Sequence, residues 1–123
     1  MSTIKTILVV DDSAVERLYL SELLYSQGYT VLEASNGDDA YEIAKKHRPD
    51  LVLMDVVMPG TNGFQATRQF SRDADLTNIP IIMSTSKENE TDKVWAARQG
   101  AKGYLIKPIQ KRQLFDLIIE LLN

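Results

Sequence analysis

The feature that most constrains this chain is an apolar run that ends in one carboxylate and a turn. The run is Leu51–Asp55 (Leu-Val-Leu-Met-Asp), and a Met-Pro-Gly turn follows at residues 58–60. An apolar run of strand length without polar alternation is typical of a strand covered on both faces, and such strands belong to parallel sheets. Ligands of open parallel sheets bind outside the carboxyl ends of the strands. Asp55 is therefore the first candidate for chemistry, although Asp is also common as a turn residue.

Composition favours one globular domain, which we expect to span residues 1–123. The chain is 44% hydrophobic and long enough to bury roughly two-thirds of its unfolded surface. Fourteen basic and seventeen acidic residues give a net charge of −3 without a basic stripe, so we expect no direct contact with nucleic acid. Cysteines, a signal peptide and a membrane span are all absent from the sequence, which favours a cytoplasmic protein without membrane contact.

Apolar runs of strand length alternate with amphipathic stretches of helix length along the chain. The predicted strands are residues 7–10, 29–34, 51–55, 79–85 and 103–106. The predicted helices lie near residues 13–27, 40–47, 63–71, 89–99 and 114–121. Five strands alternating with five helices predict right-handed βαβ units and an α/β fold with a doubly wound parallel sheet. This alternation alone leaves the order of the strands open.

Local signals predict helix ends and inward faces. Ser13 and Glu16 form a capping-box signature, Gly28 ends the first helix, and Asn36-Gly37 is expected as a turn. The residues expected to face the sheet are Tyr19, Leu20, Leu23 and Leu24 in the first helix, Phe64, Thr67 and Phe70 in the third, and Val94 and Ala97 in the fourth. Residues 73–78 are expected as a polar connection, His47 as a surface residue and Trp95 as part of the core.

Polar side chains follow four of the five predicted strands. Asp11 and Asp12 follow the first, Asp55 ends the third, Thr85 ends the fourth and Lys107 follows the fifth. The acids would also suit helix N-termini, Thr85 a strand and Lys107 a solvated loop. Because the carboxyl ends of parallel strands lie at one edge, we expect these side chains to meet there.

Three carboxylates at one edge require a counter-charge. At ~4 Å and an effective dielectric near 20, each pair repels by about 4 kcal/mol. A set of oxygen ligands without Cys or His indicates a hard divalent cation, Mg²⁺, which Mn²⁺ could replace. With the cation and Lys107 neutralising a phosphoryl group and the Thr85 hydroxyl bonding one of its oxygens, Asp55 could attack phosphorus to form an acyl phosphate.

Four motifs resemble those of the receiver domains of two-component response regulators, the CheY-like family. They are Val-Asp-Asp-Ser at 10–13, Leu-Met-Asp-Val-Val-Met-Pro-Gly at 53–60, Ser-Thr-Ser at 84–86 and Gly-Tyr-Leu-Ile-Lys-Pro at 103–108. The resemblance covers essentially the whole chain. It implies a flavodoxin-like (βα)5 fold with the strand order 2-1-3-4-5.

The resemblance also implies a role for each site residue. Asp55 would accept a phosphoryl group from a phosphohistidine of a sensor histidine kinase or its phosphotransfer domain, assisted by Thr85 and Lys107. Asp12, Asp55 and the Val57 carbonyl would bind Mg²⁺ directly, with Asp11 reaching it through water.

Further implications concern the switch and the output of the domain. Thr85 and Tyr104 match the family's switch pair, and the Lys107-Pro108 peptide bond is expected to be cis. The downstream protein target would contact the face formed by the fourth helix, fifth strand and fifth helix. Val57 and Lys87 occupy positions that vary in the family and tune dephosphorylation. Such a domain is a phosphoacceptor that assists its own phosphorylation and dephosphorylation, not an enzyme with a separate substrate.

A narrower resemblance joins two longer stretches to stand-alone receivers of the PilH type, from the chemosensory pathway that controls type IV pilus twitching motility. The stretches are Met-Pro-Gly-Thr-Asn-Gly-Phe-Gln-Ala-Thr-Arg-Gln at 58–69 and Glu-Thr-Asp-Lys-Val-Trp-Ala-Ala-Arg-Gln-Gly-Ala at 90–101. We therefore expect output by contact with another protein. A piece of a longer regulator would show the same sequence.

Four alternatives stay open at this point. An FMN-binding flavodoxin would need a first loop that accepts phosphate, which Asp11-Asp12 would repel. An aspartyl-phosphate phosphatase would carry a second acid two residues after its nucleophile, where Val57 stands. A receiver-like interaction module that works without phosphorylation, and a receiver of another chemotaxis or phosphorelay pathway, are the remaining two.

Overall fold

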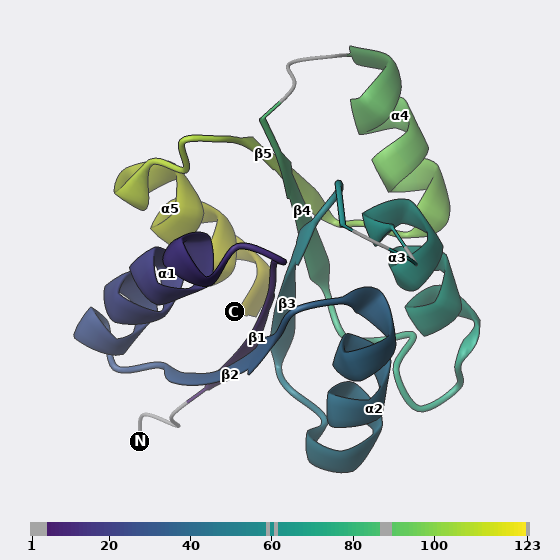
Figure 1. Cartoon of the computed structure of the whole chain (residues 1–123), viewed down its shortest axis with the longest axis horizontal. Coiled ribbons are helices and arrows are strands. Elements are labelled where there is room, and N and C mark those ends of the chain that lie inside the picture. The colour runs from purple at the N-terminus through teal and green to yellow at the C-terminus, as the bar shows by residue number, and fades with distance from the viewer. Residues whose placement is uncertain (1–4, 59, 61, 87–89, 123) are drawn as a thin grey trace.

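The computed structural model describes residues 5–58, 60, 62–86 and 90–122 and contains five strands that alternate with five helices (Figure 1). The elements are β1 (Thr6–Val10), α1 (Ala14–Ser26), β2 (Thr30–Ala34), α2 (Gly37–His47), β3 (Leu51–Asp55), α3 (Gly63–Arg72), β4 (Ile81–Thr85), α4 (Glu90–Gln99), β5 (Gly103–Ile106) and α5 (Lys111–Leu122). None of the helices in these ranges has the length and apolar content needed to cross a membrane.

The strands form one parallel sheet in the order β2-β1-β3-β4-β5, with helices on both faces. Helices α1 and α5 cover one face, and α2, α3 and α4 cover the other (Figure 1). The α/β class, the doubly wound parallel sheet and the flavodoxin-like order 2-1-3-4-5 are thus confirmed. The order places β1, β3 and β4 side by side in the centre, so the chain segments that follow them open at the same edge.

The sheet divides the hydrophobic core into two layers. Successive side chains of a strand point to opposite faces, and β1 shows this directly. Ile7 and Val9 pack with Leu20 of α1 in one layer, whereas Leu8 and Val10 pack with Phe70 of α3 in the other. All four of these β1 side chains are buried. Because both faces are covered, the strand carries only apolar residues from Ile7 to Val10, as its sequence predicts.

Local hydrogen bonds explain why β4 and α2 begin at other residues than the sequence predicts. Strand β4 begins at Ile81 instead of residue 79, because the Ile79 amide donates to the Leu76 carbonyl within a turn. Asn36 caps α2 instead of forming a turn, and its side chain accepts a hydrogen bond from the Asp39 amide. The predicted start of the fourth helix at Asn89 lies outside the described residues.

The inward face of α4 was predicted incorrectly, and on α1 Leu20, Leu23 and Leu24 face the core as predicted whereas Tyr19 does not. On α4, Val94 and Ala97 are exposed, and Ala96 is the residue buried against the sheet. Trp95, expected in the core, is 48% exposed. On α1, Tyr19 is 44% exposed and its hydroxyl donates to the Ile109 carbonyl, 3.1 Å away. The phenol can leave the core at little cost because it finds this hydrogen-bond partner at its edge.

The connection between α3 and β4 is anchored more firmly than a polar loop. Leu76 is buried, and Lys45 of α2 forms ion pairs with Asp73 at 3.1 Å and Asp75 at 2.9 Å. The Tyr41 hydroxyl donates to Asp73. This hydrogen bond, followed by the Asp75 amide and Lys45, lowers the pKa of Asp73 to about 2. The contacts hold α2 to the end of α3.

Gly63 lets α3 begin directly against the end of β3. Its amide donates to the Val56 carbonyl at 2.9 Å, and a β-carbon at this position would lie 2.2 Å from the Asp55 carbonyl oxygen and 2.8 Å from the Val56 α-carbon. Both atoms belong to the backbone, so neither can move aside alone. The glycine therefore sets how closely α3 approaches the residue that ends the central strand.

We predict that Gly63→Ala lowers the free energy of unfolding by about 3 kcal/mol, because the new methyl group overpacks a backbone contact. Gly28→Ala is the matched control, since Gly28 has φ +89° with open space around its α-carbon and should cost only the left-handed strain of about 1 kcal/mol. Urea denaturation of the two variants compares them. Equal losses of unfolding free energy in the two variants would show that the close packing of Gly63 against Asp55 adds no destabilisation.

Candidate functional site

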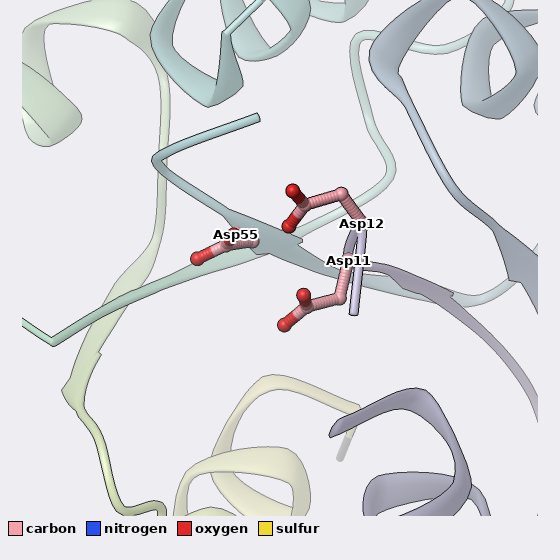
Figure 2. Close-up of side chains that lie close together, drawn as sticks. All are labelled: Asp11, Asp12 and Asp55. Atoms are coloured by element: carbon pink, nitrogen blue, oxygen red, sulfur yellow. The ribbon is translucent and has the colours of Figure 1, made fainter. Parts of the chain in front are cut away.

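The polar residues that the sequence places at strand ends come together at one edge of the sheet. Asp55 pairs in register with Ser84 of β4, and Thr85 pairs with Ile106 of β5, so these strands end level with one another. Asp11 directly follows β1, and Lys107 directly follows β5. Figure 2 shows the side chains of Asp11, Asp12 and Asp55 extending to the same side of the strand ends.

The three carboxylates form one cluster that Lys107 partly neutralises. One oxygen from each of Asp11, Asp12 and Asp55 lies within 4.8 Å of the others. The Lys107 Nζ atom lies 2.8 Å from Asp11 Oδ2 and 3.2 Å from Asp55 Oδ1. Asp11 and Asp55 are buried, whereas Asp12 is exposed. The two buried acids thus share one ammonium group, and the exposed acid, Asp12, lies where a ligand can approach from solvent.

Asp11 is held in place by hydrogen bonds from the beginning of α1. The Ser13 amide donates to Asp11 Oδ1 at 2.9 Å, while Ser13 Oγ accepts from the Glu16 amide at 3.3 Å. Ser13 is therefore the helix cap that the sequence predicts. The Ser13 amide, which a capping box would offer to Glu16, is used to orient Asp11. The complete box occurs instead at Asn62 and Gln65 of α3.

Arg17 is a site neighbour that sequence reasoning missed. Its Nη1 donates to the Asp11 carbonyl at 2.6 Å, and its Nε lies 3.4 Å from Glu33 Oε1 on β2. The guanidinium group thus ties the turn after β1 to both α1 and β2. Its position one helical turn beyond Ser13 places its side chain back over the Asp11-Asp12 turn, because helical side chains lean towards the N-terminus. That spacing is the signal that could have identified it.

The environment of Asp55 raises the pKa of its carboxyl group when no cation is bound. Burial raises the pKa of this carboxyl to about 6, and the Asp11 charge adds to the effect, while Lys107 opposes it. Burial also disfavours the charge of Lys107, yet its bonds to Asp11 and Asp55 leave the Lys107 pKa raised. An added cation would relieve the same repulsion and ionise Asp55 fully.

The remaining predicted site residues lie around this cluster. Thr85 is buried at the end of β4, and its carbonyl accepts from the Lys107 amide at 2.7 Å. Tyr104 of β5 is partly buried and packs against the core layer beneath α2, α3 and α4. The Val57 side chain is 59% exposed, two residues beyond Asp55. The Lys107-Pro108 bond is cis, as predicted. Lys87 lies outside the described residues.

The donor set of the cluster fits a hard divalent cation. All three side chains offer carboxylate oxygens within reach of one ion, and such ligands suit Mg²⁺. Two of the acids are buried together, which is costly without a compensating charge beyond that of Lys107. An exposed third acid leaves one side of the cluster open to water or to a phosphoryl group.

The chain matches the response regulator receiver domain over residues 7–119. It belongs to the receiver-domain family. It is 52% identical to Protein PilH of Pseudomonas aeruginosa over 112 residues, which cover 91% of this chain and 93% of that protein. It is 41% identical to chemotaxis protein CheY of Halobacterium salinarum, with 97% of this chain and 98% of that protein covered.

Solved receiver structures agree with the fold over nearly the whole chain. Chemotaxis protein CheY4 of Vibrio cholerae superposes with a TM-score of 0.92 at 31% identity, covering 98% of this chain and 100% of that chain. A CheY-like response regulator receiver domain protein of Methanospirillum hungatei gives a TM-score of 0.90 at 25% identity, covering 98% of this chain and 94% of that chain. Receiver domains bind Mg²⁺ at an acidic cluster, and Asp11, Asp12 and Asp55 supply such a cluster here.

We predict that stability without divalent cations falls as the pH rises through the Asp55 titration. The Asp55 pKa is about 6 in the folded protein against 3.8 for an ordinary Asp, so the folded state favours the protonated form. The stabilisation is fully present below about pH 4 and is lost as pH rises through about 6, by an amount on the order of 3 kcal/mol.

Urea denaturation between pH 4 and pH 7 in the presence of a chelator measures this effect. Asp55→Asn is the control, because its amide stays neutral and should lack the decline. The difference in unfolding free energy between the two proteins should grow with pH and shrink when Mg²⁺ is added. A difference that is constant with pH would contradict the raised pKa.

Proposed function

We propose that this chain is a receiver that Asp55 phosphorylation switches between two signalling states. The phosphoryl group comes from a phosphohistidine of a sensor histidine kinase or its phosphotransfer domain, and output passes to a protein target. The observation that carries this proposal is the position of Asp55 at the end of the central strand, where the Lys107 ammonium group contacts both its carboxylate and that of Asp11. The chain is a phosphoacceptor that assists its own phosphorylation and dephosphorylation.

In the transfer step, an Asp55 carboxylate oxygen attacks phosphorus while the phosphorus–nitrogen bond of the donor breaks. The electron pair of that bond stays on the donor imidazole, and the product is an acyl phosphate on Asp55. Lys107, at 3.2 Å from Asp55, is close enough to pair with a phosphoryl oxygen, and the Thr85 hydroxyl is the donor for another. Both contacts offset charge that accumulates on the transferring group.

The metal site of this proposal uses the carboxylate cluster. Asp12, Asp55 and the Val57 carbonyl would hold Mg²⁺, with Asp11 acting through water, and Mn²⁺ would be a substitute. The cation would supply charge neutralisation for the phosphoryl oxygens. Asp12 is suited to first contact because it is exposed, and Asp11 is suited to an indirect role because Ser13 and Lys107 already occupy its oxygens.

An apolar patch beside the site supports docking of the phosphodonor. Val15, Leu18 and Tyr19 on α1 are 76%, 59% and 44% exposed, although large apolar side chains are usually covered. Helix α1 begins three residues after Asp11, so a protein bound to this patch has its surface next to the carboxylates. The donor histidine would then reach Asp55 from the open side of the cluster.

The output surface proposed here is the face of α4, β5 and α5. A hollow of about 710 Å³ on this face is lined by residues that include Lys93, Tyr104, Lys107 and Gln113. A hydrogen bond from Thr85 to the phosphoryl group would draw the end of β4 inward. Tyr104, on the neighbouring strand, is the large side chain able to fill the space, and its movement would reshape the hollow that the target contacts.

The pathway proposed is the chemosensory control of type IV pilus twitching motility, with the chain acting in the cytoplasm. Its support is the 52% identity to Protein PilH over 91% of this chain. Membership of a different chemotaxis or phosphorelay pathway is the competing assignment, supported by the 41% identity to an archaeal CheY. A receiver that works without phosphorylation is the alternative that the first experiment below tests.

We predict that acetyl phosphate and Mg²⁺ add one phosphoryl group to the wild-type chain and none to Asp55→Asn. Intact-mass measurement after a short incubation detects the increment. Asp116→Asn is the matched control, because Asp116 is an exposed acid on α5, outside the carboxylate cluster, and should be labelled like the wild type. Equal labelling of Asp55→Asn and the wild type would rule out Asp55 as the acceptor.

We predict that beryllofluoride, which stands in for the phosphoryl group on Asp55, shifts the NMR signals of Thr85, Tyr104 and α4 as well as those of the cluster. The same addition to Asp55→Asn is the control and should leave the spectrum unchanged. Partner binding and phosphorylation must strengthen each other by the same factor. Shifts confined to Asp11, Asp12 and Asp55 would exclude output through the face of α4, β5 and α5.

A further inference from the structure

A second hollow on the opposite side of α4 is built around the only Trp of the chain. Trp95 is 48% exposed, because Ala96 is the residue that α4 turns towards the sheet. Helices α3 and α4 lie side by side (Figure 1), and a hollow of about 410 Å³ opens between them. Its lining residues are Asn62, Phe64, Gln65, Arg68, Trp95 and Gln99.

Two arginines extend this hollow into a cationic surface. Arg68 and Arg72 are exposed and stand four residues apart on α3. Neither makes an ion pair within residues 5–58, 60, 62–86 and 90–122. A neighbouring hollow of about 420 Å³ shares Gln65 and Arg68 and adds Arg72. Asp73 also lines it, but Lys45 and Tyr41 already occupy its carboxylate.

These residues define a surface that we call the α3–α4 strip: Phe64 and Trp95 at one end, Arg68 in the middle and Arg72 at the other end. One end offers apolar area that is in contact with water. Arg68 and Arg72 follow it along α3, and neither guanidinium group pairs with a carboxylate in the part of the chain that the structure describes. Trp and Arg are the residue types that most often dominate binding energy at protein interfaces. A single ligand that carries an apolar group and negative charges could therefore bind both parts of the strip.

We propose that the α3–α4 strip binds an acidic segment of a partner protein that carries one apolar side chain beside its carboxylates. The apolar side chain fills the hollow between Phe64 and Trp95, and the carboxylates form bidentate pairs with Arg68 and Arg72. A nucleic acid is the less suitable ligand, since two arginines on a chain with a net charge of −3 give a weak electrostatic footprint.

The strip is separate from the output surface proposed above. The hollow on α4, β5 and α5 and the two hollows of the strip share no lining residue. Binding at the strip requires neither a phosphoryl group nor a cation at Asp55. Failure of the phosphorylation experiment would therefore leave this proposal intact, and failure here would leave the phosphoacceptor role intact.

The probe is an acetylated and amidated peptide with one leucine followed by a run of glutamates. The peptide has no aromatic residue, and with excitation that selects tryptophan over the five tyrosines of the chain the emission comes from Trp95, which reports binding from within the site. We expect a saturable emission change at micromolar to millimolar peptide that weakens as salt is added. A peptide with glutamines in place of the glutamates should bind at least tenfold more weakly.

The decisive variant combines Arg68→Glu with Arg72→Glu and keeps Trp95 as the reporter. It should lose at least tenfold in affinity for the glutamate peptide and gain affinity for the corresponding lysine peptide. Arg112→Glu is the matched control, because Arg112 is an exposed arginine on α5 with a 93% exposed side chain, and it should bind like the wild type.

The proposal is overturned by any of four results. These are no emission change at millimolar peptide, equal binding of the glutamate and glutamine peptides, equal loss in Arg112→Glu and the double variant, or failure of the double variant to gain affinity for the lysine peptide. A thymidine oligonucleotide is titrated in parallel. Tighter binding of this oligonucleotide than of the glutamate peptide would assign the strip to nucleic acid instead.

Discussion

The repulsion between Asp11 and Asp55, and its compensation by Lys107, is the interaction on which the rest of the site depends. Both carboxylates are buried, and both lie within 3.2 Å of the same ammonium group. At an effective dielectric near 20, two such charges at ~4 Å repel by about 4 kcal/mol, which is a large part of the stability of a domain this size. The cluster thus carries more negative than positive charge, and this excess favours a bound cation.

Three neighbouring groups keep this cluster from relaxing. The Ser13 amide binds the Asp11 carboxylate, the Arg17 guanidinium group binds the Asp11 carbonyl, and Gly63 lets α3 pack against the carbonyl of Asp55. The acids can therefore lower their repulsion by taking up a proton, a cation or a phosphoryl group more easily than by moving apart. A preorganised site of this kind needs little rearrangement when its ligand arrives.

Much of this arrangement could be predicted from the sequence, because the end of a buried parallel strand is marked by the first polar residue after its apolar run. Asp55 and Lys107 interrupt apolar runs, so their shared edge followed from strand alternation, whereas the strand order came from family resemblance. Other contacts carry no such signal. The exposed and buried residues of α4 were predicted incorrectly because its polar and apolar side chains alternate without a clear stripe, which leaves Ala96 as the contact. The anchoring of Asp73 by Tyr41 and Lys45 joins residues about thirty positions apart in the chain, which no local pattern reports.

The division of the core by the sheet has a consequence for how many proteins the chain can hold at once. The exposed apolar patch of α1 lies over one layer, and the strip of Arg68 and Trp95 lies over the other, so the full thickness of the sheet separates them. Two proteins bound at these places would not compete for surface. The domain could then act as an adaptor. A phosphodonor bound at α1 and a second protein bound at the α3–α4 strip would each be held at a high effective concentration near the other.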